Sequence, residues 1–264
     1  MKSSVLKIVS LLLFLFFCTF SAQKNLPFDS LRLSDTKDLF ADDYGNIYLY
    51  KSKDFSFTKY DSLGKQKGKL MFTLPFKIQS VQNPLSIPSF SENAQELKLY
   101  DQNLNEIQTV NFRQKFGMIK IVYAEDLQQI WLLDESTKRL IQYNFRDDKI
   151  INSFPFNIDF EHVIDLLVFN NKVYILTKTH FSEYNFTSEK ILEIPYENGK
   201  RLRRENDNIL VLSKQAVKKL VSNSLVTVFN GEKAQIVDKN SSTYFVIKGN
   251  KLYLYPIQKE PEKK

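Results

Sequence analysis

The chain has 264 residues, a formal net charge of +7, two histidines and a single cysteine. The small excess of positive charge is spread along the sequence, which favours solubility over nucleic-acid binding. The one cysteine, Cys18, lies in an N-terminal segment that we expect to be removed. The mature chain would therefore have no thiolate metal ligand and no thiol nucleophile.

Residues 1–22 have the features of a secretory signal peptide. Two lysines precede an apolar run that ends at Phe20, and small residues follow. This run is shorter than the about 20 apolar residues of a membrane-spanning helix. Cleavage after Ala22 would leave 242 residues with a formal charge of +5. Two alternatives stay open: lipid attachment at Cys18, which the bulky Phe17 disfavours, and an uncleaved anchor. We expect export to the periplasm or outer membrane of a Gram-negative cell.

The first stretch after this segment contains an apolar residue, a proline and an aromatic residue, Leu26-Pro27-Phe28. The same pattern recurs as Leu74-Pro75-Phe76, Phe154-Pro155-Phe156 and Ile194-Pro195-Tyr196, where it closes a longer apolar run. The early copy has no such run in front of it. It is therefore interpreted as part of a strand whose own repeat lies elsewhere in the chain.

Short apolar runs such as NIYLY, QIWLL, KVYIL, NILVL and TYFVI follow, each bounded by Asn, Asp, Gly, Ser or Lys. This is the pattern of strands and turns, and no stretch keeps a helical period of 3.6 residues for three turns. The sequence predicts an all-β protein.

One pattern recurs six times: an apolar residue followed three residues later by Tyr or Leu. The pairs are Phe57 and Tyr60, Leu97 and Tyr100, Leu140 and Tyr143, Phe181 and Tyr184, Val217 and Leu220, and Leu252 and Tyr255. The strand before each pair begins 13 residues ahead of the Tyr or Leu in the first three copies and 11 residues ahead in the last three. A change of two residues preserves strand alternation, so it predicts shorter hairpin turns in the last three copies. The longer turns of the first three copies should raise one face of the molecule over those copies.

Four strands in about 40 residues, repeated six times, is the period of a β-propeller blade. The sequence predicts a single six-bladed β-propeller over residues 23–258, with four-stranded antiparallel blades and a charged tail at 259–264. The sixth copy lacks a fourth strand. The stretch around Leu26-Pro27-Phe28 would supply it, so that the N-terminal strand joins the last blade and closes the ring.

Two stretches resemble a known repeat family. GNIYLYKSKDFSFTKYDSLGK (45–65) and QIWLLDESTKRLIQYN (129–144) are similar to NHL-type propeller repeats, with an apolar-aromatic-apolar order, a polar turn and a strand ending in an aromatic. The resemblance is clearest in blades one and three. It implies a six-bladed ring.

Residues suited to catalysis are few. His162 lies near Asp159, Glu161 and Asp165, a mixture that suits metal binding or proton relay, but a polar connection between blades is the preferred interpretation. His180 is interpreted as a turn residue of blade four. No G-x-S-x-G motif or glycine-rich phosphate loop is present. We expect no metal, no cofactor and no enzymatic activity, with an enzyme of unfamiliar type as a remaining alternative.

The most distinctive segment is NGKRLRREND (198–207), which carries Lys200, Arg201, Arg203 and Arg204. Its position predicts the start of blade five and its innermost strand, where other copies are apolar. Arginines there would present a positive channel mouth able to hold a carboxylate, a phosphate or an acidic partner. The alternative is a solvated loop with Glu205 and Asp207 as counter-charges.

The function expected from these features is that of an exported, non-enzymatic propeller acting as a protein-interaction or scaffolding module. Its partner would be another envelope protein or complex. It would contact the longer turns at Lys53, Asn93 and Thr137 on one side and blade five on the other. The alternative is a channel-mouth binder of an anionic small ligand or a glycan. No nucleic-acid partner is expected.

Two Asp-Ser-Leu triplets, 29–31 and 61–63, resemble the acceptor sequence of a bacterial general O-glycosylation system. The resemblance implies Ser30 and Ser62 as candidate modification sites.

Overall fold

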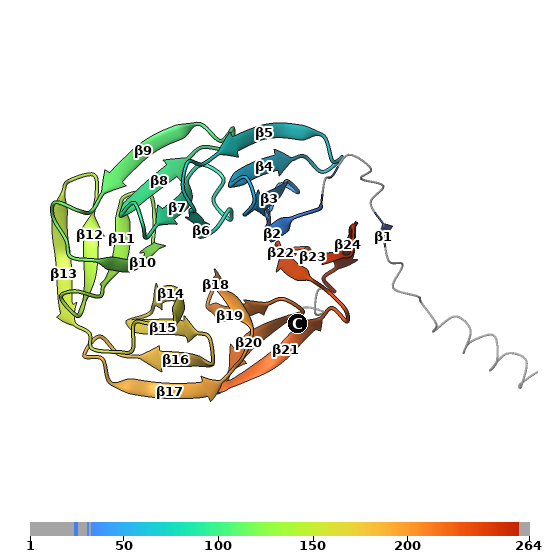
Figure 1. Ribbon diagram of the computed structural model, residues 1–264. Coiled ribbons are helices and arrows are strands. Elements are labelled where there is room, and N and C mark those ends of the chain that lie inside the picture. Colours follow the sequence, from blue (N-terminus) through green and yellow to red (C-terminus); the bar gives the residue numbers. More distant parts are fainter. Residues whose placement is uncertain (1–23, 26–30, 32, 259–264) are drawn as a thin grey trace, which may run out of the picture.

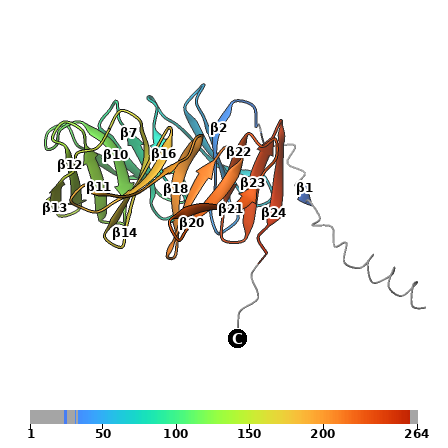
Figure 2. The same cartoon turned by 90° about the horizontal axis from the view of Figure 1, so that it is seen from below.

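The computed structural model describes residues 24–25, 31 and 33–258, which form six four-stranded antiparallel sheets arranged in a ring (Figure 1). In five sheets the strands follow one another in sequence from the centre of the ring outward. Seen from the side, the ring is a disk (Figure 2). The predicted all-β, six-bladed propeller is confirmed.

Each blade has an innermost, a second, a third and an outermost strand, and blades are numbered one to six from β2 onward. The innermost strands are β2 (Thr36–Ala41), β6 (Lys77–Ile78), β10 (Ile119–Ala124), β14 (Val163–Phe169), β18 (Gly199–Glu205) and β22 (Ile236–Lys239). The second strands are β3 (Ile47–Lys51), β7 (Ile87–Ser91), β11 (Gln129–Asp134), β15 (Lys172–Thr177), β19 (Asn208–Ser213) and β23 (Thr243–Lys248). The third strands are β4 (Ser56–Tyr60), β8 (Glu96–Tyr100), β12 (Arg139–Asn144), β16 (His180–Tyr184), β20 (Ala216–Val221) and β24 (Lys251–Pro256). The outermost strands are β5 (Gln66–Met71), β9 (Glu106–Asn111), β13 (Lys149–Pro155), β17 (Lys190–Pro195), β21 (Ser224–Asn230) and β1 (Lys24–Asn25).

The N-terminal strand closes the ring, as predicted. β1 pairs antiparallel with β24, with Lys24 opposite Leu254 and Asn25 opposite Tyr253. It is thus the outermost strand of blade six. The triplet at 26–28 used to predict this closure lies outside the described residues, as do the expected signal peptide and the tail at 259–264. Further along, Leu31 and Leu33 are buried in the hydrophobic core that blades six and one share.

The repeated pairs occupy equivalent places in the sheets, because strand alternation fixes which side chains meet. In five blades the Tyr lies opposite the first anchor of the second strand, as Tyr60 does with Ile47 and Tyr143 with Ile130. The preceding apolar residue is buried in every blade and lies opposite the far end of the second strand, as Leu140 does with Leu133. The repeat alignment read from the sequence is therefore the structural one.

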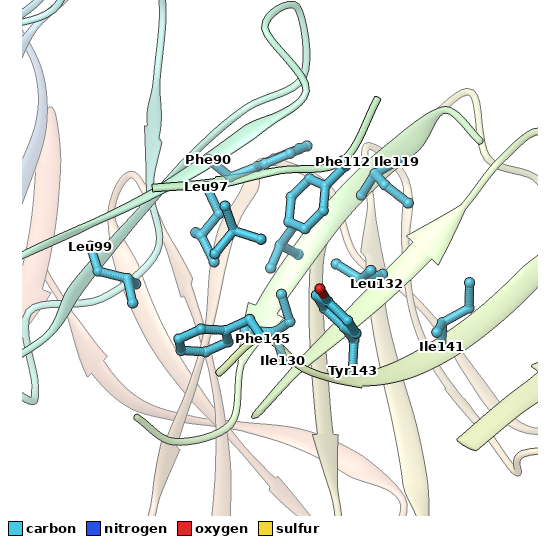
Figure 3. Packing of buried hydrophobic residues seen from close by; sticks show 12 residues of the cluster. Phe90, Leu97, Leu99, Phe112, Ile119, Ile130, Leu132, Ile141, Tyr143 and Phe145 are labelled. Carbon is cyan, nitrogen blue, oxygen red and sulfur yellow. The ribbon is translucent and has the colours of Figure 1, made fainter. Parts of the chain in front are cut away.

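The hydrophobic core is divided into six clusters, each shared by two adjacent blades. Figure 3 shows the cluster between blades two and three, where Leu97 and Phe112 pack with Ile130 and Tyr143. These apolar faces have no other place to be buried, so each blade stabilises its neighbours. The free energy of folding is therefore distributed around the ring.

The predicted step in turn length is present. The turns that join the second and third strands contain four residues in blades one to three (52–55, 92–95 and 135–138) and two in blades four to six (178–179, 214–215 and 249–250). Strand direction places all six on one face of the disk, together with the first residues of the innermost strands. We call this the stepped face. The other face carries the turns between innermost and second strands.

In the part of the chain that the structure describes, no helix has the length and apolar character needed to cross a bilayer.

Candidate functional site

The predicted basic segment forms β18, the innermost strand of blade five. Period-two alternation turns Leu202 into the core between blades four and five, while Arg201 and Arg203 face the centre of the ring. Both arginines are buried, with 6% and 7% of their surface exposed. The alternative of a solvated loop is therefore wrong for these two residues.

Arg201 ties three blades together. Its Nη2 lies 3.0 Å from Oδ1 of Asp238 in blade six, and its Nη1 lies 3.3 Å from Oδ2 of Asp38 in blade one. Nη2 also donates to the carbonyl of Leu39, and the guanidinium lies 4.1 Å from the ring centre of Phe40. Burial opposes the charge of Arg201, yet Asp38 and Asp238 hold its pKa above the ordinary value. Burial raises the pKa of Asp238, with Arg201 and Arg203 acting in the opposite direction. A guanidinium keeps its proton in proteins, so Arg201 is a buried cation whose nearest counter-charge is Asp238.

Arg203 makes a second group of contacts between blades five and six. Its Nε lies 2.9 Å from Oε1 of Glu205, and its Nη1 donates to the carbonyl of Lys239. Lys239 in turn pairs with the other oxygen of Glu205. Of the two counter-charges expected from the sequence, Glu205 is thus a partner of Arg203.

A further ion pair crosses the centre of the ring between blades two and four. Nζ of Lys77 lies 2.6 Å from Oδ1 of Asp165, whose other oxygen accepts a hydrogen bond from the backbone N–H of Leu202 at 2.7 Å. Between Arg201, Arg203 and neighbouring residues there remains a cavity of about 10 Å³, which is room for about one water molecule. These contacts divide the channel into two cups, one on each face.

The four predicted site residues are therefore not brought together at one channel mouth. Arg201 and Arg203 lie in the middle with partners from this chain. Lys200 lines the cup on the stepped face, and Arg204 lines the cup on the other face. The guanidinium of Arg204 stacks on Phe169, 3.7 Å from the ring centre.

The cup on the stepped face, which we call the lysine cup, is a cavity of about 490 Å³. It is lined by lysines from four different blades: Lys37, Lys77, Lys120 and Lys200. Lys37, Lys120 and Lys200 occupy the same place in their blades. Each is the extra residue at a shift in register between the innermost and the second strand. Such bulges re-aim side chains and are common beside functional sites.

The lysine cup was not predicted from the sequence. A signal was nevertheless present, because the segments KDLFAD (37–42), KIVYAE (120–125) and KRLRRE (200–205) each begin with a lysine at the same repeat position. That these lysines share one cavity depends on closure of the ring. Sequence spacing alone does not show it.

The cup on the other face, about 360 Å³, is more polar and mixed in charge. Glu125, Asp126, Gln82 and Tyr123 line it together with Arg204. Burial raises the pKa of Tyr123 to about 12, with Arg204 acting in the opposite direction. No single sign of charge dominates this cup.

Neither histidine lines either cup, although His162 directly precedes Val163 of the lysine cup. His162 is in the connection between blades three and four, as predicted, with Nδ1 3.3 Å from Oδ2 of Asp159. His180 is the first residue of β16, directly after the two-residue turn in which it was expected. Within the described part of the chain, no three His, Cys, Asp or Glu side chains are grouped to hold a metal ion. Ser62 is exposed in the turn between β4 and β5, and Ser30 lies outside the described residues.

Solved structures share this fold at low sequence identity. A streptogramin B lyase has a TM-score of 0.50 and 13% identity, over 90% of this chain and 87% of that one. The WD40 domain of Pan2 from Neurospora crassa has a TM-score of 0.51 and 7% identity, over 92% and 98% of the two chains. BamB from Moraxella catarrhalis, with a TM-score of 0.45 and 9% identity over 83% and 84%, is too distant to support an inference.

No protein-family model and no curated protein matches the sequence. At identities of 7% and 13% the likeness concerns the fold and not the site. The comparisons thus agree with the structure that this chain is a β-propeller.

Proposed function

We propose that this protein is a non-enzymatic interaction module of the cell envelope, which binds another protein on its stepped face. Fold alone does not determine function, so the proposal depends on a particular surface. The feature that carries it is the step itself: three four-residue turns stand side by side over blades one to three, beside three two-residue turns. Loops on a rigid scaffold are where recognition commonly occurs.

The three longer turns are held in place, which lowers the entropy cost of binding. Each ends in a residue with positive φ: Phe55 (49°), Gln95 (55°) and Lys138 (54°). The carbonyl of each accepts a hydrogen bond from the residue after the outermost strand of the same blade, at 3.1, 3.0 and 2.8 Å. The raised side is thus a preformed surface.

Further side-chain contacts anchor two of these turns. The guanidinium of Arg113 donates to the carbonyls of Asn93 and Ala94, at 3.0 and 3.1 Å. In blade three, Oδ2 of Asp134 accepts from the backbone N–H of Gly117 at 3.0 Å. These contacts fix the backbone of the turns and leave the side chains of Asn93 and Thr137 exposed, an arrangement suited to contact with a protein partner.

Export and a non-enzymatic role are parts of the same proposal. The charged, apolar, small-residue order of residues 1–22 supports export. A role without catalysis is favoured because neither histidine lines a cup. The likeness to a lyase extends only to the fold, so an enzyme of unfamiliar type is the rival to be tested.

Site-specific photo-crosslinking tests the proposed surface. A benzoylphenylalanine placed at Asn93 or Thr137, both exposed on the stepped face, should crosslink one defined envelope protein in the native cell. Asn103 and Asp147 are the matched controls, since they are exposed in turns on the other face. Crosslinking of the same protein from all four positions, or from the control positions only, would contradict the proposal.

A second candidate function is binding of an anionic ligand or glycan at a channel mouth. One observation favours it: four lysines from different blades line a single cavity on the stepped face. This candidate is independent of a protein partner.

A further inference from the structure

The lysine cup has a closed floor. The ion pair of Lys77 with Asp165 spans the ring beneath it, and Arg201 with Asp38 closes it on the side of blade one. A small molecule that enters from the stepped face therefore cannot pass through the disk. The cup is a site with one opening.

The lining of the cup is positively charged. Lys37, Lys77, Lys120, Lys200 and Arg201 line it, against the carboxylates of Asp38 and Glu92, an excess of +3. Counting Asp165 and Asp238, the buried partners of Lys77 and Arg201, leaves an excess of +1. Like charges that converge in a partly enclosed space repel one another, and a bound anion relieves this repulsion.

The four lysines differ in the ion-pair and hydrogen-bond partners that this chain provides for them. Lys120 pairs with Glu92 at 2.9 Å, and Lys77 is part of the floor. Nζ of Lys200 donates to the carbonyl of Lys37 at 3.1 Å and lies 3.7 Å from Oδ1 of Asp38. Lys37 itself has no ion-pair partner among the described residues, and its side chain is exposed at the rim.

Lys37 and Lys200 lie close together on the side of blades one and five. The backbone carbonyl of Lys37 is within hydrogen-bond distance of Nζ of Lys200. Burial lowers the pKa of Lys200, with Asp38 acting in the opposite direction. A cation whose charged form is disfavoured by burial gains from an added negative charge.

Blades two to four also contribute apolar side chains to the lining of the cup. Phe76 comes from the segment before β6, Ile121 from β10, and Val163 and Ile164 from β14. Ile164 occupies the register shift that holds a lysine in blades one, three and five, so blade four presents a hydrocarbon side chain at that place. The volume of about 490 Å³ is in the range of pockets that hold small organic ligands.

We propose that the lysine cup binds a small organic anion with an apolar body. Its carboxylate, sulfonate or phosphate is held by Lys37 and Lys200, and its apolar part packs against Phe76, Ile121 and Ile164. This inference deepens the second candidate function, and it does not depend on the protein partner.

The test uses two fluorescent probes with closely similar ring systems. Anilinonaphthalene sulfonate is an aromatic anion, and phenylnaphthylamine lacks the sulfonate. We expect the sulfonate probe to bind the folded protein once per chain, with a Kd on the order of 10 μM, and the neutral probe to bind at least about tenfold more weakly. Equal binding of the two probes, or no saturable binding of the sulfonate probe, would overturn the proposal.

Variants identify the cup as the site. Lys37→Gln should weaken binding of the sulfonate probe about fivefold, and Lys37→Gln with Lys200→Gln at least about tenfold. Lys178→Gln is the control, because Lys178 is exposed on the same face but outside the cup. Lys37 has no partner to lose, so its variant keeps the fold, which a thermal melt without probe verifies.

Anion binding by the protein and its assignment to the lysine cup are overturned by different results. If the sulfonate probe binds more tightly than the neutral one but both lysine variants behave as the parent, the cup assignment is overturned while anion binding stands. If neither preference nor saturation is seen, anion binding falls as well.

Discussion

Arg201 is the residue on which the centre of the ring depends most. Removing it by Arg201→Ala would leave Asp238, which is 1% exposed, without its nearest cation at 3.0 Å. Breaking a buried ion pair on one side typically costs about 3–5 kcal/mol. We expect a loss of that order in the free energy of unfolding, measured by urea titration.

Arg204→Ala is the matched control on the same strand, because Arg204 is exposed and contacts Phe169 at the surface. Its effect should be about 1 kcal/mol or less. Equal effects of the two substitutions would show that Arg201 is not a structural tie.

Buried tyrosines should set the highest pH at which the fold is stable. Burial raises the pKa values of Tyr123 and Tyr174 to about 12, and it raises those of Tyr48 and Tyr100 further. Unfolded tyrosines ionise near pH 10. A raised folded pKa means that stability is full below the unfolded pKa and is lost as pH rises toward the folded one.

Urea midpoints should therefore be constant up to about pH 9 and fall between about pH 10 and about pH 12. Absorbance of ionised tyrosine should rise together with unfolding, because the buried rings ionise when exposed. Ionisation of all tyrosines near pH 10 with the fold intact would contradict this account.

Among the elements, the N-terminal segment contributes more to the structure than its two-residue strand, because buried leucines follow that strand. β1 covers the edge of β24, and Leu31 and Leu33 are 6% and 7% exposed in the core between blades six and one. Deleting residues 23–33 should destabilise the protein by roughly 4 kcal/mol or more, since each buried leucine lost costs about 2–5 kcal/mol. Aggregation through the exposed edge should follow.

Thermal unfolding and light scattering measure both effects. Deleting residues 260–264 is the control, and it should change neither, because a charged tail has no apolar side chain to bury. A 23–33 deletion that melts as the parent does would show that ring closure is unimportant.

The strands and the step in turn length were predictable because both follow local rules. Alternation places Phe57 and its equivalents on one face, and a two-residue deletion in a hairpin keeps that alternation. The partners of Arg201 were not predictable. Asp38 and Asp238 lie 163 and 37 residues away in sequence, and only ring closure brings them to one guanidinium. The lysine cup was missed for the same reason.

At the scale of the whole molecule, the two proposed sites share one face. The lysine cup opens on the stepped face, and Glu92 and Asn93 belong both to its lining and to a longer turn of blade two. A protein bound across the step would cover the cup, so anion and partner would compete or cooperate. The other face has the mixed cup, and its turns between innermost and second strands are also longer in blades one to three (five, eight and four residues) than in blades four to six (two, two and three).

The proposed function requires that the raised turns of the stepped face bind a protein partner. The decisive measurement is the affinity of the crosslinked partner, once purified, for a variant in which 52–53, 93–94 and 136–137 are deleted. This variant gives blades one to three the two-residue turns of blades four to six. Its control lacks 62–63, 102–103 and 146–147, which are turn residues on the other face. We predict at least about a tenfold rise in Kd for the first variant and no change for the control. A folded first variant that binds the partner as tightly as the parent would contradict the account.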